Sequence, residues 1–83
     1  MLEPIYILSK AENGCLFVTQ KDQYFADFSF YVKENPDANL MIEDIIENES
    51  IIFVDLEDHS FYLNDDKENS IVIPLNEVKQ IGS

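Results

Sequence analysis

The chain has 83 residues, and its 17 Asp and Glu against 5 Lys, with no Arg, give a net charge of −12 at pH 7. This length predicts a single small domain over residues 1–83, and the charge excludes nucleic acids and anionic membranes as direct partners, because both are bound through basic side chains. The only cysteine, Cys15, excludes an internal disulfide and favours the cytoplasm, while the acidic first residues and the lack of an apolar run of about 20 residues predict neither a secretory signal nor a membrane span.

The first predicted element is a β-hairpin. Apolar segments at 5–8 and 15–18 flank the dipeptide Asn13-Gly14, which is typical of a two-residue type I′ turn because both of its positions adopt positive φ. This turn sets Lys10 opposite Phe17. It also places four apolar side chains on one face: Tyr6, Leu8, Cys15 and Phe17.

A third strand is predicted over residues 24–32. Its apolar residues alternate with polar ones, and this period of two indicates one buried face. The side chains predicted to be buried are Ala26, Phe28, Phe30 and Val32.

A helix of about three turns is predicted next, a length near the globular average. Either Asn35, followed by Pro36, or Asp37 can cap its start. Its apolar stripe, at spacings of three and four, consists of Ala38, Met41, Ile42 and Ile45. Because several isoleucines are β-branched and acids stand at the negative end of the helix dipole, a strand over 40–46 is the alternative.

The second half of the chain predicts three more strands. Residues 51–56 are nearly all apolar and predict a central strand buried on both faces. Residues 60–63 and 70–73 form the next two strands, on either side of a polar turn. Leu75, Val78 and Ile81, spaced by three, predict a short helical turn.

These elements predict an α+β fold, in which one helix packs on a mostly antiparallel sheet in the order β-β-β-α-β-β-β. The short connections favour antiparallel pairing. The alternative is a small SH3-like β-barrel with a helical insertion. The closing segment, residues 70–81, resembles the segment with which such barrels close.

The strongest functional signal is a block of acidic residues. Residues 34–66 contain 11 carboxylates and no Lys or Arg, and charge blocks of one sign often form interaction surfaces. The helix and the following hairpin are expected to be neighbours in space. Tyr62 adds an aromatic ring suited to cation–π contacts. The predicted partner-binding residues are Glu43, Asp44, Glu47, Asp55, Glu57, Asp58 and Tyr62.

No catalytic, cofactor or metal motif is apparent. One His and one Cys do not recur at ligand spacing for zinc, and no segment has the ligand pattern of an EF-hand. We therefore expect no enzyme activity, no cofactor and no metal centre. A loose, weak cation site at Asp65-Asp66-Glu68 is the one alternative that the acidic turn leaves open.

The expected function is that of a small acidic protein-binding module. In size and charge the chain is similar to immunity proteins and phage-encoded inhibitors of nucleases. That resemblance implies an inhibitor that blocks a basic, nucleic-acid-acting protein by presenting carboxylates in place of phosphates, after electrostatic steering. The alternative is a structural or adaptor subunit of a larger assembly, or a homodimer, in which the acidity is incidental.

Overall fold

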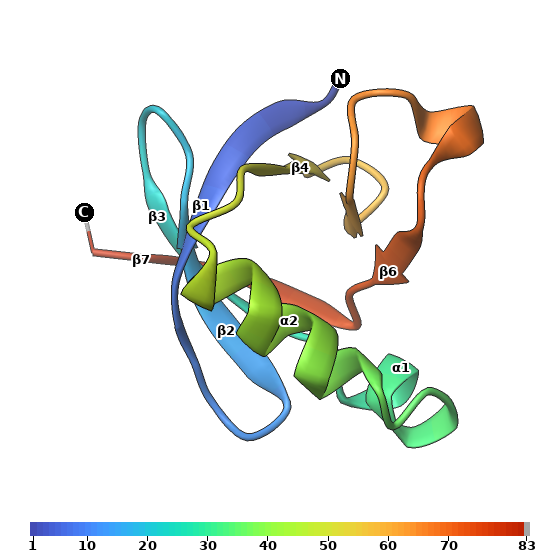
Figure 1. Cartoon of the computed structure of the whole chain (residues 1–83). Coiled ribbons are helices and arrows are strands. Elements are labelled where there is room, and N and C mark those ends of the chain that lie inside the picture. Colours follow the sequence, from blue (N-terminus) through green and yellow to red (C-terminus); the bar gives the residue numbers. More distant parts are fainter. Residues whose placement is uncertain (83) are drawn as a thin grey trace.

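The computed structural model describes residues 1–82, in which seven strands, two α-helices and one 3₁₀ turn are found (Figure 1). The strands are β1 (Glu3–Lys10), β2 (Gly14–Val18), β3 (Gln23–Asp27), β4 (Ile52–Asp55), β5 (Ser60–Tyr62), β6 (Val72–Pro74) and β7 (Glu77–Ile81). The helices are α1 (Ser29–Glu34), α2 (Ala38–Glu47) and the 3₁₀ turn η1 (Lys67–Asn69).

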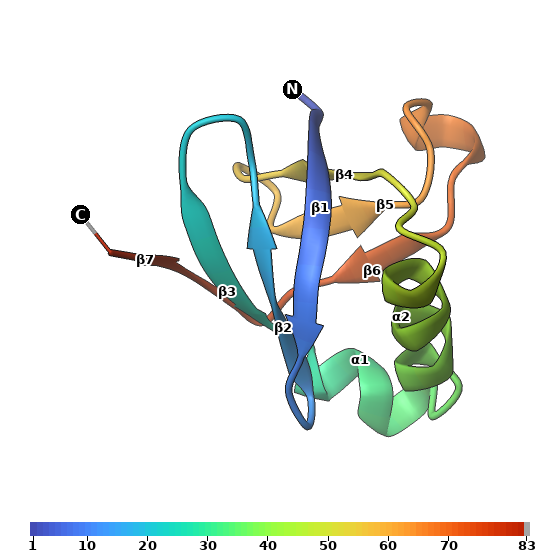
Figure 2. The same cartoon turned by 60° about the vertical axis from the view of Figure 1, so that its left-hand side comes forward.

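The strands form one antiparallel sheet in the order β6-β5-β4-β1-β2-β3-β7. Strands β6 and β7 lie at opposite edges of this sheet, although only Leu75 and Asn76 separate them in the chain. The sheet must therefore bend strongly, as Figure 2 shows, yet no ladder joins its two edges. The predicted α+β fold is confirmed, and the alternative of a closed barrel is wrong.

The concave side of the bent sheet holds the core. Phe17, Phe28 and Phe61 are fully buried there, and the rings of Phe17 and Phe61 meet edge to face with centroids 5.2 Å apart. Helix α2 packs against β1 and contributes Ile42 and Ile45 to the same core. Within residues 1–82, neither helix has the length or the apolar character that crossing a bilayer requires.

The first hairpin forms, but its predicted register is wrong. Its turn spans residues 11–13, closed by a hydrogen bond from the Ala11 amide to the Gly14 carbonyl (2.9 Å), and neither Asn13 nor Gly14 has positive φ. Lys10 consequently pairs with Cys15 instead of Phe17. A shift of two residues preserves the faces of a strand, so this difference alone would not exchange them.

A β-bulge exchanges them. The ladder is irregular between Ile7 and Ser9, so that Ile7 pairs with Phe17, and an extra residue on one strand inverts the side-chain alternation beyond it. Ile7 therefore joins the core, whereas Tyr6 and Leu8, predicted to share the face of Cys15, are about half exposed, at 50% and 49%.

The predicted strand over 24–32 is too long. Strand β3 ends at Asp27, whose carboxylate accepts a hydrogen bond from the Ser29 amide (2.8 Å), and the side-chain oxygen of Asn76 accepts one from the Phe30 amide (3.3 Å). These two bonds start α1, because they satisfy amides that a helix start leaves free. Phe28 is buried as predicted, but Phe30 is 74% exposed.

Helix α2 confirms the predicted stripe, because Ala38, Ile42 and Ile45 are buried; the alternative strand over 40–46 is therefore wrong. The backbone of Asp37 occupies the cap position. The strand predicted over 51–56 is present as β4, although β5 is more completely buried.

The helical turn predicted after residue 74 is wrong. Residues 77–81 form the edge strand β7, in which five residues pair with β3. The edge of β3 would otherwise leave backbone groups unpaired, and this pairing overrides the spacing of three.

Candidate functional site

The solvent face of α2 carries three of the predicted site residues, Glu43, Asp44 and Glu47, which we call the helix triad. All three are exposed, and the apolar stripe of α2 occupies the opposite side of the helix. Residues three or four positions apart are neighbours on a helix surface, so Glu47 lies beside both other members. Among residues 1–82, no basic group forms an ion pair with the triad.

Helix α2 ends in a C-capping motif that has an unusual residue at its key position. The Glu49 amide donates to the Ile46 carbonyl (3.1 Å) and the Ser50 amide donates to the Ile45 carbonyl (3.0 Å), which is the Schellman arrangement. Glu49 stands at the position that usually holds glycine, with φ of 51°. The last turn of the helix has no basic residue, although the helix dipole favours one there. The carboxylates at this end therefore weaken the helix electrostatically.

The other predicted site residues lie in the turn between β4 and β5, where Asp55 has a structural role. Asp55 is only 3% exposed, and its carboxylate accepts hydrogen bonds from the amides of Glu57 (2.9 Å) and Asp58 (3.3 Å). It also forms an ion pair with Lys67, and the N-terminal amine of Met1 lies 3.3 Å away. The hydrogen bond from Lys67, with those of the two amides, holds the pKa of Asp55 well below its ordinary value.

Lys67 also contacts Asp58 and Tyr62 in this turn. Its ammonium group lies 3.2 Å from the Asp58 carboxylate and 5.2 Å from the centre of the Tyr62 ring. The Tyr62 hydroxyl donates to the same Asp58 oxygen (2.7 Å), and this bond is the main reason that the pKa of Tyr62 is raised. We call Asp55, Asp58, Tyr62 and Lys67 the turn network.

Most of the predicted site residues in this turn are not free to contact a partner, because they belong to the turn network. Asp55 and Tyr62, which is 7% exposed, are buried, and the charge of Asp58 is shared with Lys67. Glu57 alone of the predicted turn residues is exposed without an ion-pair partner among residues 1–82.

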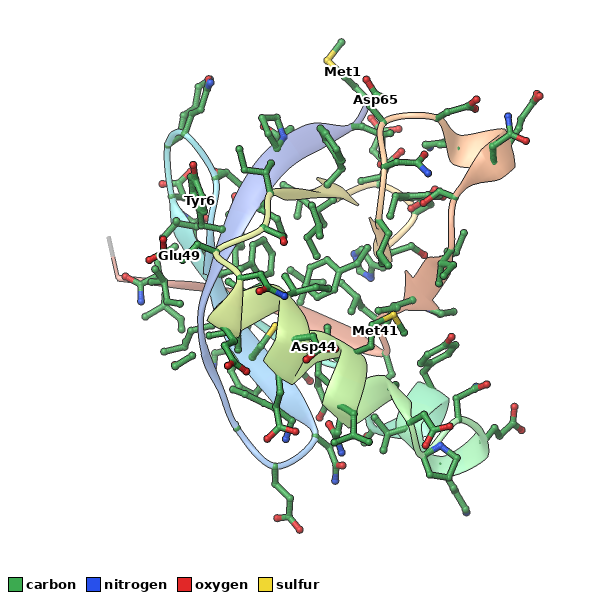
Figure 3. All side chains as sticks on the ribbon, viewed as in Figure 1. Met1, Tyr6, Met41, Asp44, Glu49 and Asp65 are labelled. Carbon is green, nitrogen blue, oxygen red and sulfur yellow. The ribbon has the colours of Figure 1, made fainter. Side chains whose placement is uncertain are left out.

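The helix triad and the turn network do not meet. Asp55 is at the far end of β4 from α2, next to Met1, and Figure 3 shows Met1 well separated from Asp44. The two groups of acidic residues therefore belong to separate parts of the surface, and Lys67 neutralises part of the block from just outside it.

A groove lies along the seam between β1 and the end of α2, with a volume of about 510 Å³. Figure 3 shows Tyr6 and Glu49 close together at this seam. We call it the β1–α2 groove; its lining residues are Tyr6, Ile7, Leu8, Ile45, Ile46, Glu49 and Ser50. The sequence did not indicate it, because the predicted register placed Tyr6 and Leu8 on the same face as Cys15 and Phe17, which are buried.

The remaining chemistry of the described residues is limited. No group of three His, Cys, Asp or Glu side chains within residues 1–82 converges in a way that could hold a metal ion. In the turn considered for a weak cation, the Asp66 carboxylate accepts hydrogen bonds from the Glu68 amide (3.1 Å) and the Asn69 side chain (2.7 Å). The Cys15 thiol is fully buried, which raises its pKa to about 12 and leaves it protonated at neutral pH.

Comparison of the chain with protein-family models, with curated proteins and with solved structures gives no match.

Proposed function

We propose that this protein is an acidic protein-binding module whose helix triad engages a basic surface of another protein. The single observation that carries the proposal is the exposed, unpaired state of Glu43, Asp44 and Glu47 at the end of a helix that their charge destabilises. In the turn network, by contrast, Asp55 and Asp58 are paired with Lys67. A basic partner would supply the counter-charge that α2 lacks.

The partner that we favour is a protein that acts on nucleic acid. Such proteins have Lys and Arg clusters that bind phosphates, and carboxylates on a rigid helix are a competing set of anions. The long-range field of a chain with a net charge of −12 would speed its encounter with such a cluster. Occupation of that cluster would make the module an inhibitor. The buried thiol is compatible with the cytoplasm as the place of action.

The test is charge reversal with a matched control. The protein is used to capture its partner from cells of its source at low salt, and association is then measured with the captured partner. Reversal of Glu43, Asp44 and Glu47 to Lys should slow association strongly. Reversal of Glu12, Glu68 and Glu77, which are also exposed and change the net charge by the same amount, should have a much smaller effect. The proposal is wrong if the two triple variants slow association equally, or if neither variant slows it.

A second candidate function is that of an adaptor subunit or homodimer. It is favoured by three exposed apolar side chains near the first strand, Tyr6, Leu8 and Ile51, at 50%, 49% and 49% exposure. Sedimentation velocity at increasing protein concentration separates the two functions, because a homodimer formed through apolar contacts should persist at high salt.

A further inference from the structure

The β1–α2 groove is a second recognition element next to the helix triad. We propose that it receives a segment of a partner protein in which an aliphatic or aromatic side chain stands beside Lys or Arg. This inference rests on the proposed function, because it specifies the chemistry of the same basic partner. It goes further because it requires the partner to insert an apolar side chain, whereas binding through charge alone would not require one.

The lining of the groove provides the apolar contact. Ile7 and Ile45, each 8% exposed, join it to the core, whereas Tyr6 and Leu8 are half exposed at its mouth. Tyrosine is enriched among interface hot spots, which lie in well-packed pockets that exclude water.

A second hollow extends the apolar surface on the other side of Tyr6. It has a volume of about 310 Å³, and its lining includes Pro4, Val18 and the exposed Ile51. Tyr6 lines both hollows and so forms the ridge between them. An extended segment lying across this ridge would contact both.

The charges around the groove select for a basic segment. Glu49 is part of the lining, and none of the lining residues is basic. Glu43 lies three positions before Ile46 on the helix surface, so the helix triad continues the acidic rim from the groove onto α2. An apolar side chain flanked by Lys or Arg fits both parts of this surface.

A second copy of the chain fits less well. Association of two copies through this groove would bring two acidic rims together, and the net charge of −12 on each chain opposes this. Charge complementarity therefore favours a basic partner over self-association.

The test uses a display library of random 12-residue peptides selected against the immobilised full chain. We expect enrichment of peptides in which an apolar residue stands next to Lys or Arg. One selected peptide is then made in two altered forms, with the apolar residue replaced by Ser or with its basic residues replaced by Gln. Both changes should weaken binding at low salt.

Matched protein variants locate the site. Tyr6→Thr with Leu8→Thr keeps residues that suit strands and removes the anchor contacts, and should weaken peptide binding at least about tenfold. Glu49→Asn removes a rim charge while suiting positive φ, and should slow association. The controls are Ile71→Thr, which changes an apolar side chain of 54% exposure outside the groove, and Glu12→Gln. Circular dichroism and thermal unfolding confirm that each variant is folded.

The outcomes separate this inference from the proposed function. If reversal of the helix triad abolishes peptide binding and the groove variants do not, the groove is excluded and the proposed function stands. If binding depends on Tyr6 and Leu8 but not on any basic residue of the peptide, this inference is overturned, and the charge-reversal experiment alone decides the proposed function. Absence of enrichment, or self-association that the groove variants abolish, also overturns the inference.

Discussion

Substitution of Glu47 by Lys should stabilise the protein, although it reverses a charge at the proposed binding surface. Glu47 is the last residue of α2, exposed, with Glu43 four positions and Asp44 three positions before it. Each like-charge pair at these spacings is unfavourable by about 0.2–0.5 kcal/mol, and each pair of opposite charge is favourable by a similar amount. The substitution would also replace an anion by a cation at the negative end of the helix dipole, which contributes about 0.3–1 kcal/mol at exposed positions.

These contributions give an increase of about 1.5 kcal/mol in the free energy of unfolding at low ionic strength, toward the low end of their sum because all of the groups are exposed to solvent. For a domain of this size that corresponds to a rise in Tm of about 6–12 °C. Urea unfolding followed by far-UV circular dichroism at about 0.02 M and 0.5 M salt measures it, and the gain should shrink at the higher concentration because salt screens exposed charges.

The control is Glu12→Lys, which makes the same change in net charge at a position in the turn between β1 and β2, outside any helix. It should change stability by no more than about 0.5 kcal/mol, the usual range for surface positions. The argument about α2 is refuted if Glu47→Lys destabilises the protein, if it gains no more than the control, or if its gain is the same at both salt concentrations.

Three further predictions concern the core and the turn network. Gly14→Ala should lower the free energy of unfolding, measured by urea titration, by about 1–3 kcal/mol. The reason is that the new methyl carbon would overlap the Ala26 carbonyl oxygen. An unchanged urea midpoint would contradict the register of β2 and β3. Because the pKa of Asp55 is depressed from its ordinary value of 3.8, chiefly by Lys67, its contribution to stability is complete above that pH and is lost as the pH falls through the depressed pKa. Lys67→Met should therefore be less stable at neutral pH and lose less stability between pH 4 and pH 2, and parallel pH profiles would exclude this pair as the cause. The Cys15 thiol should react with a disulfide reagent at pH 8 only at the rate of local opening; reaction at the rate of a free thiol would show that it is not buried.

The parts of the fold that local sequence determines were predictable. The spacing of Ala38, Ile42 and Ile45 specifies the buried face of α2, and the apolar run before Asp55 specifies β4. Both signals lie within a single element. They sufficed for the α+β class, although α1 and β7 were not among the predicted elements.

The parts that were predicted wrongly depend on contacts between distant residues. The start of α1 uses the side chain of Asn76, which lies 46 positions after the Phe30 amide that it accepts from. Strand β7 exists because β3 has a free edge, and periodicity within 75–81 contains no information about that edge. The bulge in β1 likewise becomes apparent only when the pairing partner is known.

The same distinction applies to the site. Exposure of the helix triad follows from the amphipathic pattern of α2, which is local. The pairing of Asp55 with Lys67, 12 positions away, is not, and a count of charges between residues 34 and 66 treats Asp55 as free although its partner stands one residue beyond that range. Net charge in a segment therefore overstates the charge that its folded surface presents.

The places where α2 departs from the usual rules of helix composition lie together in space. Glu47 stands where a basic residue would stabilise the helix, and Glu49 stands where glycine would relieve a positive φ. Beside them Tyr6 and Leu8 expose apolar surface that the core does not use. Sequences are expected to agree with their fold at every level except where another requirement acts. Of these exceptions, Glu49, Tyr6 and Leu8 line one groove, and Glu47 stands two residues before Glu49. The proposed binding of a basic and apolar segment would account for these exceptions, because such a segment would pair with the carboxylates and cover the exposed side chains at once.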